Sequence, residues 1–157
     1  MSTQAASIRV AMAASIAALG VAATPAHADR VYHSEHLALA PVAGAPLRSG
    51  FVQNIKAEGP VVYAHEIFVL NGARRGATYT VTRNFFPFDR DCSGDNGVFA
   101  SDVATLTTNR SGNARGDLFV RPDEVAGFEG VHGVKWTVQD AGGVLAYRTA
   151  CTAVTLD

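Results

Sequence analysis

The sequence predicts an all-β protein, a single-domain antiparallel β-sandwich of immunoglobulin-like or Greek-key type, with a small β-barrel as the alternative. Residues 29–157 contain 16 Val, 10 Thr and 13 aromatic residues, but 8 Leu and no Met. Such β-branched and aromatic side chains favour strands. Fourteen glycines divide this region into short segments. No apolar period of 3.6 residues persists there for more than a turn or two, which argues against helices.

Residues 1–28 have the composition of a cleavable signal peptide. Arg9 precedes an uncharged apolar run, 10–23, and the tripeptide 26–28 (AHA) matches the small-x-small rule for cleavage. The run is 14 residues long, too short for a membrane-spanning helix, which needs ~20. We therefore expect one soluble domain, 29–157, that is secreted or periplasmic and has no membrane span after cleavage. The Ala-rich leader is typical of bacteria.

The charge balance excludes one class of partner. The chain has 13 Lys and Arg against 14 Asp and Glu, a formal net charge of -1. Removal of 1–28 takes away one Arg, which leaves 12 − 14 = −2. A nucleic-acid-binding domain carries a basic excess, so we expect no nucleic-acid partner.

Four strands are expected in the first half of the domain. The segments 36–42 and 50–57 both run into Gly and Pro residues. The third segment, 61–70, is apolar on both faces, which predicts a central place in its sheet. The fourth, 77–85, alternates apolar residues with threonines, as does a strand with one face in water.

A long polar loop, 86–102, is expected next. Turn signals then separate four more strands, 103–108, 114–120, 133–139 and 144–156. Residues 123–128 predict a single helical turn between the second and third of these. In 133–139, the residues Val134, Trp136 and Val138 alternate with polar residues, so they should face inward.

Cys92 and Cys151 predict a disulfide, because an exported domain meets an oxidising environment. Cys92 lies in the predicted loop and Cys151 on the last predicted strand, so the bridge should pin one to the other. The alternative is a reactive cysteine nucleophile, which would need a histidine close in space.

The segment 89–95 matches the first half of a calcium-binding loop through Asp89, Asp91, Ser93 and Asp95, with Gly94 at the sharp turn. The second half departs from the pattern, because position twelve is Ala100 instead of a bidentate Glu. Asp102 lies two residues further on. The same residue types are common in any exposed turn. Calcium is therefore the alternative to a simple loop in 89–102.

Two groups of ionisable residues raise the question of a catalytic or metal site. His65 and Glu66 lie within an apolar strand, so at least one of them should be partly buried, as a perturbed acid or in a structural pair. Near the start of the domain, two histidines and a glutamate could join a later histidine around zinc or copper. These residues are His33, Glu35, His36 and His132. The alternative is a solvated tail.

Aromatic residues stand at the entrance of the predicted loop. Phe86 and Phe88, with Phe85, would form a binding patch if exposed. The alternative is that they fold back and close the end of the sandwich.

No sequence motif of a serine hydrolase, a zinc protease, a phosphate-binding loop or a CxxC redox centre occurs in the chain. We therefore expect an exported β-sandwich module of non-catalytic function, which binds an unknown extracytoplasmic ligand or protein or has a structural role. The loop 86–102 is its expected functional end. The alternatives are a calcium- or other metal-binding protein that uses 89–102, and a small hydrolase or redox enzyme that uses His65, Glu66 or His132.

Overall fold

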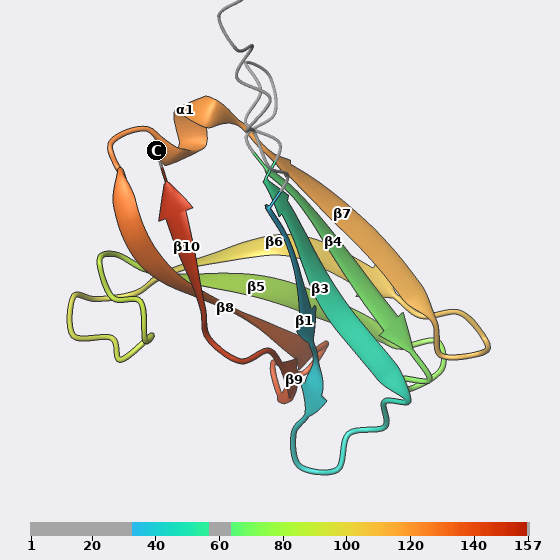
Figure 1. Ribbon diagram of the computed structural model, residues 1–157. Coiled ribbons are helices and arrows are strands. Elements are labelled where there is room, and N and C mark those ends of the chain that lie inside the picture. The colour runs from blue at the N-terminus through green and yellow to red at the C-terminus, as the bar shows by residue number, and fades with distance from the viewer. Residues whose placement is uncertain (1–32, 57–63, 157) are drawn as a thin grey trace, which may run out of the picture.

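The computed structural model describes residues 33–56 and 64–156, and most of them lie in antiparallel strands (Figure 1). The predicted signal peptide and the first residues of the predicted strand 61–70 lie outside the described residues. The elements are β1 His33–Ala38, β2 Ala40–Pro41, β3 Ser49–Lys56, β4 Ala64–Asn71, β5 Thr78–Phe86, β6 Phe99–Thr107, β7 Ala114–Val120, α1 Pro122–Val125, β8 Gly130–Asp140, β9 Leu145–Arg148 and β10 Thr152–Leu156.

The described strands form two sheets. Sheet A has the order β1-β3-β4-β7, and sheet B the order β2-β9-β8-β5-β6, with β10 also paired to β8. In Figure 1 the strands of sheet A cross β5 and β6 of sheet B at a steep angle. Neither sheet closes on itself in the described part of the chain, so the barrel alternative does not hold there. No helix among these residues is long and apolar enough to cross a membrane.

The core fills the space between the sheets, and the predicted alternation of β8 is confirmed. Val134, Trp136 and Val138 are all buried, and Trp136 has no exposed surface. The predicted central strand is confirmed as β4, which pairs with β3 on one side and β7 on the other. The remaining core residues come from both sheets: Leu39, Val52, Phe68, Leu70, Ala73, Tyr79, Val81, Leu106, Ala146 and Tyr147.

The first predicted strand, 36–42, is two strands in different sheets. β1 pairs with β3, and β2 pairs with β9. Between them the N–H of Leu39 donates to the carbonyl of Gly50 over 2.9 Å, and the Leu39 side chain is buried. Leu39 thus anchors the point at which the chain passes from sheet A to sheet B.

The predicted loop 86–102 is too long, because β6 begins at Phe99 instead of residue 103. The first residues of β6 resemble a loop in the sequence, because Ser101 and Asp102 are polar. They pair with Arg83 and Thr82 of β5 beyond a register shift. β6 is an edge strand, and these residues are exposed. An edge strand tolerates polar residues that obscure an alternating pattern.

The last predicted strand, 144–156, is interrupted between β9 and β10. Thr149 explains the interruption, because its Oγ1 accepts the N–H of Trp136 while its own N–H donates to the Trp136 carbonyl. A side chain thereby replaces a backbone group in the ladder. The predicted helical turn, 123–128, is shorter and starts earlier, as α1, with Pro122 in its first turn.

Candidate binding surface

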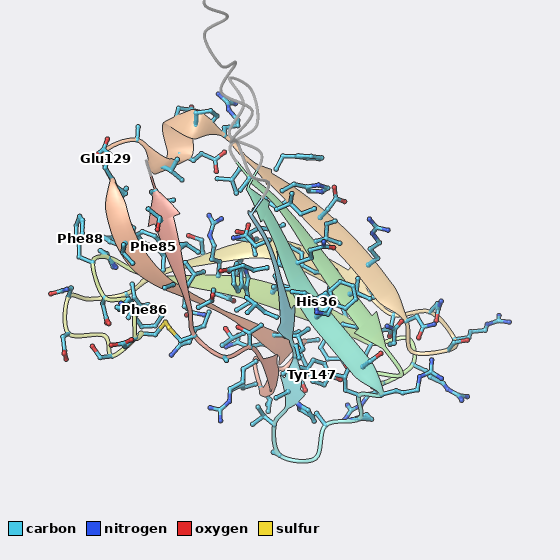
Figure 2. All side chains as sticks on the ribbon, viewed as in Figure 1. His36, Phe85, Phe86, Phe88, Glu129 and Tyr147 are labelled. Atoms are coloured by element: carbon cyan, nitrogen blue, oxygen red, sulfur yellow. A yellow bond between two sulfur atoms is a disulfide. The ribbon has the colours of Figure 1, made fainter. Side chains whose placement is uncertain are left out.

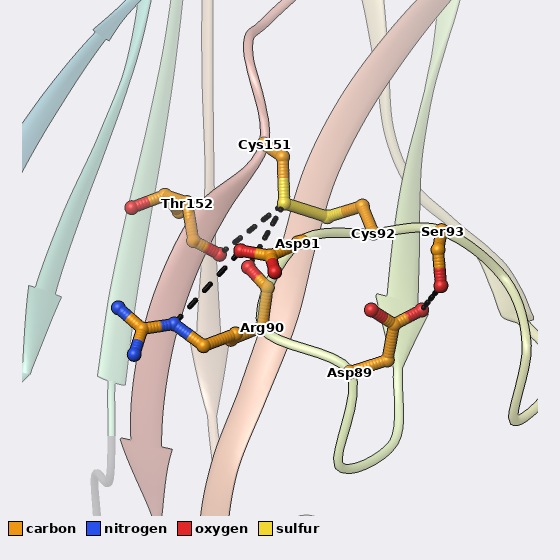
Figure 3. Close-up of polar contacts among 7 residues, drawn as sticks. All are labelled: Asp89, Arg90, Asp91, Cys92, Ser93, Cys151 and Thr152. Carbon is orange, nitrogen blue, oxygen red and sulfur yellow. Dashed lines mark hydrogen bonds and ion pairs between the residues drawn. A yellow bond between two sulfur atoms is a disulfide. The ribbon is translucent and has the colours of Figure 1, made fainter.

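The loop 87–98 joins β5 to β6 and is fastened to sheet B by the predicted disulfide, which is confirmed. Cys92 and Cys151 are bonded, with their Cα atoms 6.0 Å apart, and Cys151 directly precedes β10 (Figure 3). Both sulfurs are engaged, so neither cysteine is available as a nucleophile in this form of the protein.

The loop also lies directly on β8, at Gly133. A Cβ atom at this position would collide with the carbonyl oxygen of Asp89 and would lie 2.8 Å from Sγ of Cys92. The absence of a side chain at Gly133 therefore allows the loop to pack directly against β8. Cys92 itself adopts a left-handed backbone conformation, with φ 53°, as it turns toward Cys151.

Asp89 organises the loop from within. Its Oδ2 accepts the N–H of Gly94 over 2.7 Å and the hydroxyl of Ser93 over 2.9 Å. These bonds, led by that from Gly94, favour the carboxylate against the effect of burial and hold the pKa of Asp89 below its ordinary value of 3.8. The arrangement is a side-chain-capped turn.

Of the other residues of the predicted calcium loop, Ser93 bonds to Asp89, whereas Asp91 and Asp95 do not join it. The side chain of Asp91 is 87% exposed and lies beside Arg90, with 3.9 Å between Oδ1 and Nε. Asp95 is exposed, and its N–H donates to Oγ of Ser93. Within the described ranges, no group of three or more His, Cys, Asp or Glu residues could hold a metal ion. Calcium binding by 89–102 stays a prediction of the sequence.

His132 ties the start of the loop to the end of the sandwich. Its ring is fully buried. Nδ1 accepts the N–H of Phe88 over 3.0 Å, so that nitrogen carries a lone pair. Nε2 lies 2.9 Å from the carbonyl oxygen of Phe128, to which it therefore donates. The two bonds require the neutral tautomer that carries its proton on Nε2.

Three phenylalanines lie around His132 and a fourth, Phe99, lies against one of them. Together they define what we name the aromatic end surface: Phe85, Phe88, Phe99 and Phe128. Phe85 stacks on the His132 ring at 4.8 Å and meets Phe128 edge to face at 5.5 Å. The ring of Phe88 lies 4.8 Å from His132, and that of Phe99 lies 6.2 Å from Phe128. Phe88 is 61% exposed and Phe99 is 58% exposed. Figure 2 shows Phe85 and Phe88 at this end of the molecule.

Phe86, the other aromatic residue predicted to bind, does not belong to this surface. It is 3% exposed, on the opposite face of β5 from Phe85, and the Lys135 ammonium lies 4.7 Å from its ring centre. The alternation of side chains along a strand separates the two neighbours. The sequence analysis missed Phe99 and Phe128 as members of this surface. Phe99 comes close to Phe85 because the two residues pair between β5 and β6, and Phe128 comes close to Phe85 through the path of the chain after α1.

His65 and Glu66 face opposite sides of β4, as the strand period requires. His65 stacks on Phe119 at 4.2 Å, and its Nε2 lies 3.2 Å from Oδ2 of Asp117. Glu66 is buried and accepts hydrogen bonds from Arg83 and Trp136. Glu66 therefore has structural partners. His132 belongs to sheet B, and its ring bonds to backbone groups of Phe88 and Phe128 instead of to His65 or Glu66.

The residues proposed for a metal near the start of the domain also have other contacts. The His36 ring lies 4.2 Å from that of Phe51. Glu35 accepts a hydrogen bond of 3.0 Å from the hydroxyl of Thr152, which links β1 to β10. His33 belongs to β1, where its backbone is opposite Lys56.

A hollow of about 470 Å³ lies beside the disulfide, on the outside of sheet B. Lys135, Arg148, Thr137 and Asp91 contribute polar groups to it. The hollow therefore carries both signs of charge. It was not visible in the sequence, because it depends on the position of the disulfide-bonded loop over β8 and β9.

No protein-family model matches this chain, and neither a curated protein nor a solved structure matches it.

Proposed function

We propose that the protein is an exported β-sandwich module that binds another exported protein through its aromatic end surface. The observation that carries this proposal is the pair of exposed rings on a rigid base. Phe88 and Phe99 are each more than half exposed. Fully buried rings would not be free to contact a partner, whereas each of these two residues keeps more than half of its surface in solvent.

The base of the surface is held in place before any partner arrives. The N–H of Phe88 is bonded to the buried His132, and Phe99 pairs with Phe85 in the β-ladder. A pre-organised surface loses little conformational freedom on binding. Polar side chains of the loop, such as Arg90 and Asp95, are exposed at its side. An apolar centre with a polar rim is the usual composition of a protein interface.

The binding free energy that the two exposed rings can contribute suits a protein partner. Burial of roughly 200 Å² of ring surface at ~25 cal/mol per Å² contributes about 5 kcal/mol before the cost of association. The rings alone therefore do not give tight binding. The neighbouring loop residues must add contacts, which an extended protein surface can provide.

The disulfide supports export, because disulfides form and persist in oxidising compartments. N-terminal sequencing of the protein recovered from an expressing bacterium tests this part of the proposal. We expect cleavage after Ala28 and a mature chain that starts at Asp29. An intact N-terminus would contradict it. The path of the chain, in which β7 returns to sheet A after two strands of sheet B, supports a Greek-key sandwich.

The binding test uses the double variant Phe88→Ser/Phe99→Ser and the matched control Val144→Ser. Val144 is 62% exposed and lies in the turn after β8. Proteins cross-linked to the wild type in the exporting cell are identified by mass spectrometry and then measured as purified pairs. We expect the control to retain affinity and the double variant to lose at least about tenfold. Equal affinity of the double variant for every partner would refute the proposal.

A further inference from the structure

The outward face of sheet A is apolar, unlike that of sheet B. Along β3 and β4 the inward residues, such as Val52 and Phe68, are buried, so their neighbours in the chain point outward. The outward residues are His36 and Ala38 of β1, Phe51, Gln53 and Ile55 of β3, His65, Ile67 and Val69 of β4, and Arg115, Asp117 and Phe119 of β7. We name this set the outer face of sheet A.

Sheet B shows what the solvent face of this protein normally looks like. The outward residues of β5 include Thr80 and Thr82, and those of β8 include Lys135 and Thr137. An antiparallel sheet with one wet face has such polar residues there. The outer face of sheet A has Ile67 and Val69 at its centre instead, and Phe119 is 52% exposed. An apolar patch of this kind marks an interaction site.

The charges on this face lie along one edge. Apart from histidine, the charged residues among the outward set are Arg115 and Asp117, both on β7. The register aligns Asp117 with Ile67 and Gln53, and aligns Arg115 with Val69 and Phe51. The face therefore has two adjacent rows, each with an apolar residue on β4 and one charge on β7. The two charges are opposite.

We propose that a second copy of this chain covers the outer face of sheet A. A two-fold axis that runs between these rows, parallel to the sheets and across the strands, would exchange them. Asp117 of one copy would then lie opposite Arg115 of the other, and Ile67 opposite Val69. One patch thereby contacts itself, as a symmetric dimer requires. Two flat sheet faces stack at about 10 Å, which suits side chains of this size.

The area of the face is close to the minimum for a dimer. Four strands at about 4.8 Å and about seven residues at about 3.4 Å give a flat footprint of roughly 460 Å² per copy. The two copies together bury roughly 900 Å², near the lower limit of about 1,000 Å² for a specific interface. The aromatic end surface does not belong to this face, so the two proposals are independent.

Sedimentation velocity of the exported protein, across concentrations up to roughly 100 µM, tests the dimer. We expect the wild type to dimerise and Ile67→Lys to be monomeric. Thr80→Lys, on the outer face of sheet B, is the matched control and should dimerise like the wild type. The thermal midpoint of each variant verifies folding. A monomeric wild type, or a dimer that Ile67→Lys leaves intact, would overturn the proposal.

The charges test the geometry. Arg115→Asp and Asp117→Arg each place like charges opposite one another in the symmetric dimer, and each should weaken it at least about tenfold. The double variant Arg115→Asp/Asp117→Arg restores both pairs, so it should recover dimerisation. Single variants that weaken the dimer without recovery in the double variant would overturn the proposed axis. Phe88→Ser/Phe99→Ser should leave the dimer unchanged, which separates this proposal from the binding function.

Discussion

Trp136 donates a hydrogen bond of 3.0 Å from Nε1 to Oε2 of Glu66, although 70 residues separate them. The other oxygen of the same carboxylate accepts a hydrogen bond of 2.8 Å from Arg83. Glu66 belongs to sheet A, whereas both donors belong to sheet B. One buried carboxylate therefore joins the two sheets across the core.

Glu66→Gln should destabilise the fold strongly. The amide removes the charge that balances Arg83, whose side chain is 22% exposed, and its NH₂ group faces a donor. Loss of one partner of a buried ion pair costs about 3–5 kcal/mol, which urea unfolding followed by Trp136 fluorescence would measure. Glu129→Gln, at an exposed glutamate, should stay within about 0.5 kcal/mol of the wild type. A similarly small effect at Glu66 would show that the ion pair is dispensable.

The double variant Cys92→Ser/Cys151→Ser should lower the free energy of unfolding by about 4 kcal/mol, because the bridge closes a loop over a sequence separation of 59. Thermal unfolding with and without reductant measures the loss. Reductant should shift the wild type to the midpoint of the double variant and leave the double variant itself unchanged. A reductant effect on the double variant would mean that the shift has another cause.

Asp89→Asn should change the response to acid. The pKa of Asp89 in the folded state is lower than its ordinary value of 3.8, so the carboxylate stabilises the fold above that value. As the pH falls through the folded-state pKa, this contribution is lost. The midpoint difference between wild type and Asp89→Asn should therefore be largest above the ordinary pKa of 3.8 and shrink as the pH falls below it. Asp95→Asn, an exposed residue of the same loop, should retain the wild-type profile. A constant difference across this range would contradict the assignment.

Gly133→Ala should loosen the loop from β8, because its methyl group would collide with the backbone of Asp89 and with Cys92. We expect a lower midpoint and faster reduction of the disulfide by a mild thiol. Gly142→Ala is the matched control, since the nearest atom there is a side-chain oxygen, Oδ1 of Asp140, at 3.3 Å. Identical reduction rates for the two variants would mean that the loop does not depend on Gly133.

Tyr147→Phe should lower the free energy of unfolding and reduce the dependence of that free energy on pH in the alkaline range. The Tyr147 hydroxyl donates to the carbonyl of Pro46 over 2.8 Å, so the Tyr79 hydroxyl, 3.2 Å away, donates to it. Burial, with the contact to Tyr79, raises the pKa of Tyr147 above its ordinary 10.0. Its contribution is therefore complete below pH 10.0 and is lost as the pH rises further, because the unfolded chain ionises first.

Thermal melts from neutral to alkaline pH would measure both effects. At neutral pH the loss should be about 1–3 kcal/mol, because the Pro46 carbonyl loses its donor and the hydroxyl of the buried Tyr79 loses its acceptor. Tyr79→Phe leaves the bond to Pro46 in place and should cost less. Equal losses in the two variants would contradict this order of donors.

Much of the fold follows from local pattern. Strict alternation predicts the inward residues of β8, and an apolar run on both faces predicts the central position of β4. The start of β6 and the break after β9 were predicted wrongly for the same reason, because a single sequence does not show which strands pair. Ser101 and Asp102 look like a loop until β5 pairs with them, and the break after β9 depends on the bond between Thr149 and Trp136.

The site was less predictable, because its residues meet only through the fold. The disulfide followed from the cysteine count, since two cysteines allow one pairing within the chain. The neighbours Phe86 and Phe88 look alike in sequence, yet one is buried beneath Lys135 and the other is exposed beside His132. The apolar pattern of β4 predicted its central position but did not show that one of its two apolar faces is the outward face of sheet A.

The fastened loop has a practical consequence for peptide display. Cys92 is fixed by its bond to Cys151, and Phe99 begins a paired strand, so the segment 93–98 has both ends held by the rest of the protein. A foreign peptide of ten residues inserted after Gly97 would lengthen this closed segment at an entropic cost of about 1 kcal/mol. The domain could thus serve as a carrier that presents a guest epitope without disturbing its core.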